Sequence, residues 1–240
     1  MEFRGAVDSH GWRKVWDWSF GLGSLVPALL YGVAIGNILR GLPIQADGTL
    51  YISLLYLLNP YALLVGLLSL VMFTMHGAAY LALKTEGDRQ KELARWIIGS
   101  WMAFVVLYLV ATVATYFVSG FLFEGILASP LFWILLPLLL IAIIAIPVAT
   151  KAGKFRQAFQ ASSVTIMSMI GLMGLSLFPR MVPSIIDLNN SLTIYNASST
   201  GRTLYVMLVI ALIGMPVVIG YTIFIYRVFK GKVVLTDESY

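Results

Sequence analysis

The stretch that decides the fold is "LFWILLPLLLIAIIAIPVAT" at residues 131–150, which contains no charged side chain. A bilayer core about 30 Å thick is crossed by about 20 residues of α-helix, which rises about 1.5 Å per residue. The stretch does not alternate between apolar and polar positions, as a strand of a transmembrane barrel would. Because backbone polar groups in hydrocarbon must bond within their own segment, these residues predict a membrane-spanning helix.

The composition of the whole chain agrees with this interpretation. Of the 240 residues, 60% are apolar and only 11% are charged, and the mean hydropathy is +0.89. Soluble domains carry about 25% charged residues. The net charge of +5 is explained by basic loops of a membrane protein, so no nucleic-acid partner is expected. The chain has no cysteine, which excludes disulfides and thiolate-bound metal or iron–sulfur sites within it.

Five further stretches have the same apolar character. The sequence therefore predicts an all-α, polytopic membrane helix bundle, a single membrane domain over residues 1–240 with six transmembrane helices at about 19–39, 61–83, 96–118, 131–150, 160–178 and 205–226. Thirteen of the sixteen Lys and Arg residues fall in the opening, in two alternate connectors and in the tail. The positive-inside rule then predicts that both termini are cytoplasmic, with residues 1–18 and 84–95 as cytoplasmic connectors.

The predicted spans contain no Asp, Glu, Lys or Arg. Ionisable residues inside a membrane usually mark ion or proton pathways, so their absence argues against a self-sufficient pump. One imidazole, His76, lies within a span. It is either a haem ligand or a neutral side chain bonded to a neighbouring helix, and the second is favoured because His10 is the only other histidine. The spacing of Gly32 and Gly36 indicates close helix packing.

Three longer stretches resemble one known family. They are "WRKVWDWSFGLGSLVPALLYGVAIGN" at 12–37, "LLNPYALLVGLLSLVMFTMHGAAYLALKTEGD" at 57–88, and "FPRMVPSIIDLNNSLTIYNASSTGRTLYVMLVIALIGMPVVIGYTIFIYRVFKGKV" at 178–233. In order and spacing they resemble subunit II of the cytochrome bd-type ubiquinol oxidases. Members of that family carry additional helices before an "EFR" segment, which here is residues 2–4. The resemblance implies that the chain corresponds to the C-terminal two-thirds of subunit II, truncated before residue 1, and that Met1 is an internal methionine.

The resemblance also implies a function. The complex oxidises quinol, reduces dioxygen to water and generates a proton-motive force in the prokaryotic cell membrane. In that family haem b and haem d belong to subunit I, so this chain is expected to be its haem-free partner without a cofactor of its own. A structural quinone is bound by subunit II in some members. Two alternatives remain open, namely a multi-pass permease for a neutral solute and a non-functional truncated remnant.

Few site residues follow from the resemblance, and none of them is catalytic or a metal ligand. Glu2, Arg4 and Tyr240 match a cytoplasmic proton-uptake region. A quinone or subunit contact is expected at Trp16, Asp17, Trp18 and His76. The tryptophans also lie where an interfacial aromatic belt is expected.

Overall fold

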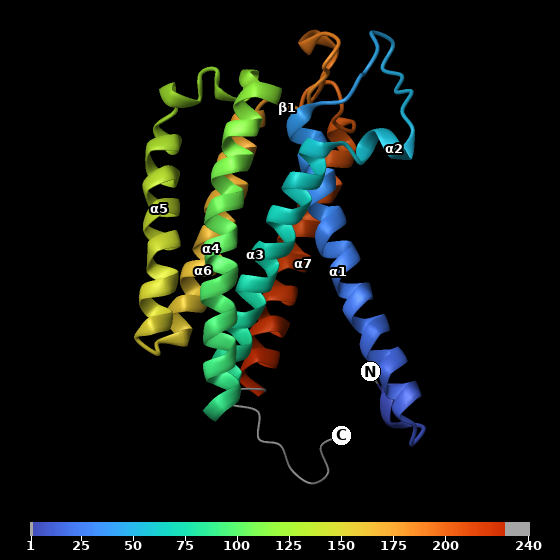
Figure 1. Ribbon diagram of the computed structural model, residues 1–240. Coiled ribbons are helices and arrows are strands. Elements are labelled where there is room, and N and C mark those ends of the chain that lie inside the picture. Colours follow the sequence, from blue (N-terminus) through green and yellow to red (C-terminus); the bar gives the residue numbers. More distant parts are fainter. Residues whose placement is uncertain (1, 229–240) are drawn as a thin grey trace.

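The computed structural model describes residues 2–228 of the chain and is built from long helices (Figure 1). Six of them are long and apolar enough to cross a membrane, which confirms the predicted all-α membrane bundle. They are α1 (His10–Arg40), α3 (Pro60–Lys84), α4 (Gly87–Val118), α5 (Pro130–Lys151), α6 (Phe155–Leu177) and α7 (Gly201–Val228). The start of α1 and the end of α7 lie at the same end of the molecule.

Short elements occupy the connectors. They are the 3-10 helices η1 (Glu2–Gly5), η2 (Gly120–Phe123), η3 (Ile126–Ala128) and η4 (Leu188–Asn190), the single-turn helix α2 (Leu54–Leu57), and the strands β1 (Arg180–Val182) and β2 (Leu192–Thr193). The two strands pair antiparallel within the α6–α7 connector.

Two helices begin well before their predicted spans. Helix α1 begins at His10 and α4 begins at Gly87, so the connectors predicted at residues 1–18 and 84–95 are partly helical. The Ser9 hydroxyl caps α1 by accepting a hydrogen bond from the backbone N–H of Trp12. The α1 start is therefore set by a cap, whereas α4 has no side-chain cap and starts in a segment rich in Arg, Gln, Lys and Glu, which are good helix formers in water.

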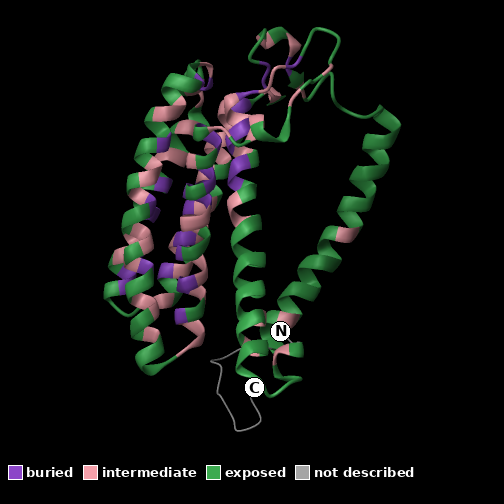
Figure 2. Ribbon diagram, turned by 45° about the vertical axis from the view of Figure 1, so that its right-hand side comes forward, coloured by how far each residue is buried: buried purple, intermediate pink, exposed green. Residues whose placement is uncertain are grey.

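Helices α3, α4, α5 and α6 form an antiparallel four-helix bundle that holds the main core. Its largest fully enclosed apolar side chains come from three of the helices: Met75, Ile97, Phe104, Leu139 and Ile146. Figure 2 shows burial concentrated in this bundle and in one half of α1. Helix α7 stands apart from the bundle in that view, and none of its residues is buried.

The upper half of α1 packs on α3 at glycines. A Cβ added to Gly32 would lie 2.5 Å from the Cβ of Ser69 and 2.6 Å from the backbone oxygen of Val65. A Cβ on Gly36 would lie 2.8 Å from the Cα of Ala62. These approaches confirm the close packing that the Gly32–Gly36 spacing predicted, because any side chain would push the two backbones apart.

The connectors at the end opposite the helix α1 start form a hydrogen-bonded cap. The Ser184 hydroxyl donates to the backbone oxygen of Ile44 at 2.9 Å, which joins the α6–α7 connector to the α1–α2 connector. The Leu42 N–H donates to the backbone oxygen of Pro183 at 2.9 Å. Ser191 accepts from the Ser184 N–H at 3.0 Å. The long polar connector after α6 therefore covers the top of α1.

We predict that Gly32→Ala loosens the α1–α3 contact, because its Cβ meets backbone atoms that cannot move aside. Overpacking of this kind costs about 1–3 kcal/mol in the free energy of unfolding. The matched control is Gly23→Ala on the same helix, where an added Cβ meets no atom within 4 Å. Thermal unfolding in mild detergent should show a lower midpoint for Gly32→Ala only. Equal midpoints for the two variants would contradict the packing described.

Candidate functional site

Several of the residues expected at a site meet where η1 folds back on the start of α1. The Arg4 guanidinium donates two hydrogen bonds to the Asp17 carboxylate, Nε to Oδ1 at 2.7 Å and an Nη to Oδ2 at 3.0 Å. The Trp12 indole N–H donates to the Phe3 backbone oxygen at 2.7 Å. Phe3 also stacks on Trp16, with ring centroids 6.0 Å apart. We call these five residues the N-terminal cluster.

The electrostatics of the N-terminal cluster follow from that fork-shaped contact. The carboxylate of Asp17 raises the pKa of the Arg4 guanidinium, first through the hydrogen bond and then through its charge. Both side chains are substantially exposed, 39% for Arg4 and 48% for Asp17, so water screens the pair. The Trp16 indole nitrogen is buried without a hydrogen-bond partner among residues 2–228. This indole N–H is thus enclosed by the cluster and left without a hydrogen bond within the described residues.

The other predicted site residues do not join this cluster. Trp18 is 64% exposed and points to the surroundings of α1. Glu2 is the first residue of η1, but its side chain lies outside the described part of the structure. Tyr240 lies outside the described residues altogether. His76 is on α3, inside the four-helix bundle. The sequence thus named two separate places rather than one site.

His76 has an internal partner. Its Nδ1 lies 2.8 Å from the Ser162 hydroxyl of α6, and its ring stacks on Phe159 with centroids 4.7 Å apart. Ser162 is fully buried and its hydroxyl also donates to the backbone oxygen of Phe159 at 2.8 Å. This is the bond to a neighbouring helix that the sequence favoured.

A bis-histidine haem does not fit these residues. One ring nitrogen of His76 is engaged with Ser162, and one face of the ring is covered by Phe159. His10, the other histidine, is the first residue of α1, at the end that leans away from the bundle in Figure 1. Haem coordination by two histidines needs both imidazoles on one iron, which this arrangement does not provide.

Sequence reasoning missed a polar pair where α1 meets the start of α3. Asn37 is buried and its amide donates to the backbone oxygens of Val33 and Leu57, both at 2.8 Å. Its side-chain oxygen accepts from the Asn59 amide at 2.9 Å. The signal was present, because a lone Asn inside an uncharged span must find partners within the protein.

Two apolar surfaces have no partner within the described residues. Helix α7 contains no buried residue, and the buried residues of α1 are confined to positions 32–37. Glycines on these surfaces face open space, since an added Cβ at Gly21, Gly23, Gly214 or Gly220 would meet no atom within 4 Å. The fold defines a class: a multi-pass membrane protein, with a compact four-helix bundle and two helices exposed along much of their length.

Comparison with known proteins gives the family. Residues 1–229 match the cytochrome bd terminal oxidase subunit II family. The chain is 32% identical to a probable cytochrome oxidase subunit 2 of Haemophilus influenzae, over 97% of this chain and 69% of that protein. It is 33% identical to the cytochrome bd ubiquinol oxidase subunit 2 of Bacillus subtilis, over 97% and 68%. It is 29% identical to the cytochrome bd-I ubiquinol oxidase subunit 2 of Escherichia coli strain K12, over 99% and 70%.

The chain belongs to the cytochrome bd terminal oxidase subunit II family, as the resemblance of its three long stretches predicted. Its role is that of subunit II of such an oxidase.

We predict that His76 acts through its hydrogen bond and not as a haem ligand. His76→Leu should lower the free energy of unfolding by about 0.6 kcal/mol, and by no more than about 1.7, as for other hydrogen bonds between membrane helices. His76→Gln keeps a polar group that can reach Ser162 and should cost less. Haem content per complex, measured as pyridine haemochromogen, should be unchanged in both variants. Loss of one haem in both would overturn this assignment.

Proposed function

We propose that this chain is the haem-free partner of a haem-bearing subunit I, and that it lies as a single membrane domain in the inner or plasma membrane of a prokaryote. Its family and relatives make it a member of a quinol oxidase complex. Subunit I carries haem b and haem d, oxidises quinol and reduces dioxygen to water, with generation of a proton-motive force. Subunit II supports that subunit and offers a place for a structural quinone.

The observation that supports a partner subunit is the open space beside the glycines of α7 and of the first half of α1. A glycine inside a helix costs about 0.5–1 kcal/mol relative to alanine. In membranes this cost is offset where the missing side chain lets another helix approach closely. Gly32 and Gly36 have such a neighbour in α3, whereas Gly214 and Gly220 have none among residues 2–228. A helix from outside residues 2–228 would fill that space, and we assign this place to subunit I.

The N-terminal cluster is the part of this surface that we assign to specific contact. Trp16 and Asp17 lie on the exposed half of α1, close to the charged end of the helix. The Trp16 indole N–H is buried without a hydrogen bond, and a carbonyl oxygen of a quinone or of the partner's backbone would satisfy it if binding opens the cluster. Trp18 and His76 are retained as weaker contact candidates. Glu2, Arg4 and Tyr240 remain the proposed proton-uptake region at the cytoplasmic side.

The orientation is proposed from charge. The connectors and helix ends on the side of the α1 start hold most of the basic residues, including Lys84, Arg89, Lys151 and Lys154. Positive loops stay in the cytoplasm, so the α1 start and the α7 end are cytoplasmic and the hydrogen-bonded cap is on the outer side.

We predict that the tagged full-length chain, isolated in mild detergent, carries haem b and haem d bands in a reduced-minus-oxidised spectrum. The matched variant ends at Thr200 and lacks α7, a helix that the rest of the chain does not enclose. It should be membrane-inserted but colourless, or carry at most a small part of the haem. A colourless full-length chain from cells that express subunit I would contradict the proposed partnership. Full haem retention by the shortened chain would exclude α7 as the docking helix.

A second prediction tests orientation and uses the absence of cysteine. Ala152 is exposed in the α5–α6 connector and Ala197 is exposed in the α6–α7 connector, so each can be replaced by a single cysteine. In intact spheroplasts a membrane-impermeant maleimide should label Ala197→Cys, because that connector faces outward. It should label Ala152→Cys only after permeabilisation. The reverse pattern would mean that both ends of the described chain face outward.

A further inference from the structure

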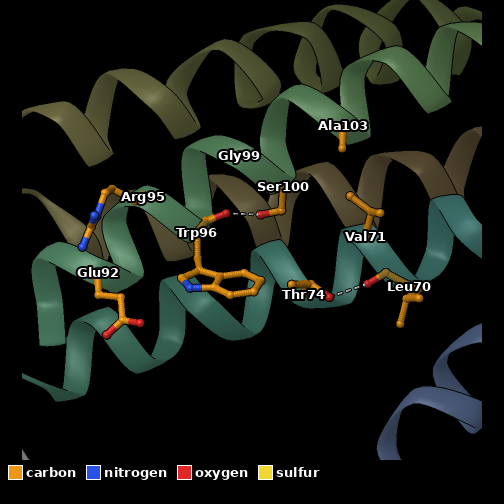
Figure 3. Close-up of a pocket in the computed structure, with 9 residues that line it drawn as sticks. All are labelled: Leu70, Val71, Thr74, Glu92, Arg95, Trp96, Gly99, Ser100 and Ala103. Carbon is orange, nitrogen blue, oxygen red and sulfur yellow. Dashed lines mark hydrogen bonds between the residues drawn. The ribbon is translucent and has the colours of Figure 1, made fainter.

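A groove runs along the outer face of the α3–α4 pair, near the end where these two helices are joined. Its cavity is about 570 Å³, within the range of about 300–1,000 Å³ found for small-molecule sites. Figure 3 shows Glu92 and Arg95 at one end and Leu70, Val71 and Ala103 at the other. The indole of Trp96 lies across the groove between them and is 58% exposed.

The groove is apolar beyond Trp96, although two hydroxyls line it. The Thr74 hydroxyl donates to the Leu70 backbone oxygen at 2.8 Å, and the Ser100 hydroxyl donates to the Trp96 backbone oxygen at 2.6 Å. Both hydroxyl protons are therefore engaged within their own helices. Gly99 leaves open space, since an added Cβ would meet no atom within 4 Å. Neither hydroxyl is a free donor for a polar ligand, whereas an alkyl chain would fit.

The charged end of the groove holds two opposite charges that do not neutralise each other. Glu92 and Arg95 are one helical turn apart, yet neither takes part in an ion pair within 4.0 Å among residues 2–228. The preceding turn behaves differently, because Lys91 and Asp88 pair at 2.9 Å. The groove thus presents an unpaired guanidinium and an unpaired carboxylate side by side, each free to bind a group of opposite charge.

The position of the groove along α4 matches the boundary between the headgroups and the hydrocarbon of a bilayer. Arg95 is the last charged residue of α4, and no charge follows before the helix ends at Val118. Tryptophan at such a boundary is typical of the headgroup level of a bilayer. A molecule in this groove would have its polar end beside Arg95 and Glu92 and its apolar end at hydrocarbon depth.

We propose that the α3–α4 groove is a binding site for a zwitterionic phospholipid with a primary amine. Its phosphate binds Arg95, its ammonium binds Glu92, and one acyl chain lies past Trp96 and over Gly99. Charge complementarity decides the headgroup, because a purely anionic lipid would bring a phosphate beside the Glu92 carboxylate without a compensating cation. The residues of this site come from α3 and α4 alone and include none of the N-terminal cluster.

A second, smaller groove would bind a different class of lipid. It has a volume of about 350 Å³, lies between α4 and α5, and presents Arg95 together with Lys151. Two cations without a carboxylate would favour an anionic headgroup, as basic pockets between membrane helices on the cytoplasmic side do. The two grooves share Arg95 and Gly99, so the lipid class and the second charged residue distinguish them.

The test adds lipid to the tagged 240-residue chain, purified with any subunits that remain bound to it and delipidated in mild detergent. The probes are dioleoyl phosphatidylethanolamine and dioleoyl phosphatidylglycerol, and native mass spectrometry counts the bound lipids. We expect one retained phosphatidylethanolamine. Its dissociation constant should rise about tenfold or more in Arg95→Gln, because a charge-assisted hydrogen bond is lost. Glu92→Gln should weaken phosphatidylethanolamine and not phosphatidylglycerol.

Two further variants control this experiment. Arg89→Gln removes an exposed charge of the same helix outside the groove and should leave binding unchanged. Gly99→Leu fills the groove without changing charge and should weaken binding of the acyl chain. Unchanged binding in Arg95→Gln or in Gly99→Leu would overturn the proposal. So would tighter binding of phosphatidylglycerol that depends on Lys151, which would place an anionic lipid in the α4–α5 groove.

Discussion

The arrangement of the helices depends on a few hydrogen bonds that cross from one helix to another. In lipid the hydrophobic effect does not drive helices together, so packing and polar bonds must do so. Four contacts have such bonds. Ser69 donates to the Ala28 backbone oxygen between α1 and α3, and Tyr61 bonds with Thr115 between α3 and α4. The Trp101 indole donates to the Ile143 backbone oxygen between α4 and α5, and His76 bonds with Ser162 between α3 and α6. Each bond fixes the rotation and height of one helix against the next.

Because these bonds are few, the remaining specificity comes from shape. The glycines of α1 and α3 allow the backbones to touch, and a deep core of Met75 and Phe104 fills the four-helix bundle. The cap of Ser184 and Ser191 then ties the connector after α6 to the connector after α1. Helix α7 follows directly from this cap. Its position is therefore set at one end by hydrogen bonds in the connector, and not along its length by packing.

Much of this could be predicted from the sequence, and the reasons are physical. Uncharged runs of about 20 residues predict spans because hydrocarbon excludes charge, and basic connectors predict sidedness. The ends of α1 and α4 could not be found in this way, since capping by Ser9 and the helix propensity of a charged segment act in water. The Arg4–Asp17 fork, the Asn37–Asn59 pair and the partner of His76 depend on the approach of distant segments. A single sequence shows the residues of such pairs but not their pairing.

Open space beside a glycine has a different physical meaning on α7 and in the α3–α4 groove. Exposure of leucine or valine on α7 carries no cost in lipid, because acyl chains are as apolar as those side chains. Apolar area alone is thus no argument for a protein partner. The glycines are such an argument, because Gly214 and Gly220 lower the stability of the helix and make no close contact within residues 2–228. At Gly99 the open space has another explanation, since it borders charges that match a lipid headgroup. A glycine beside unpaired charges indicates a lipid groove, and a glycine on an uncharged helix face indicates another helix.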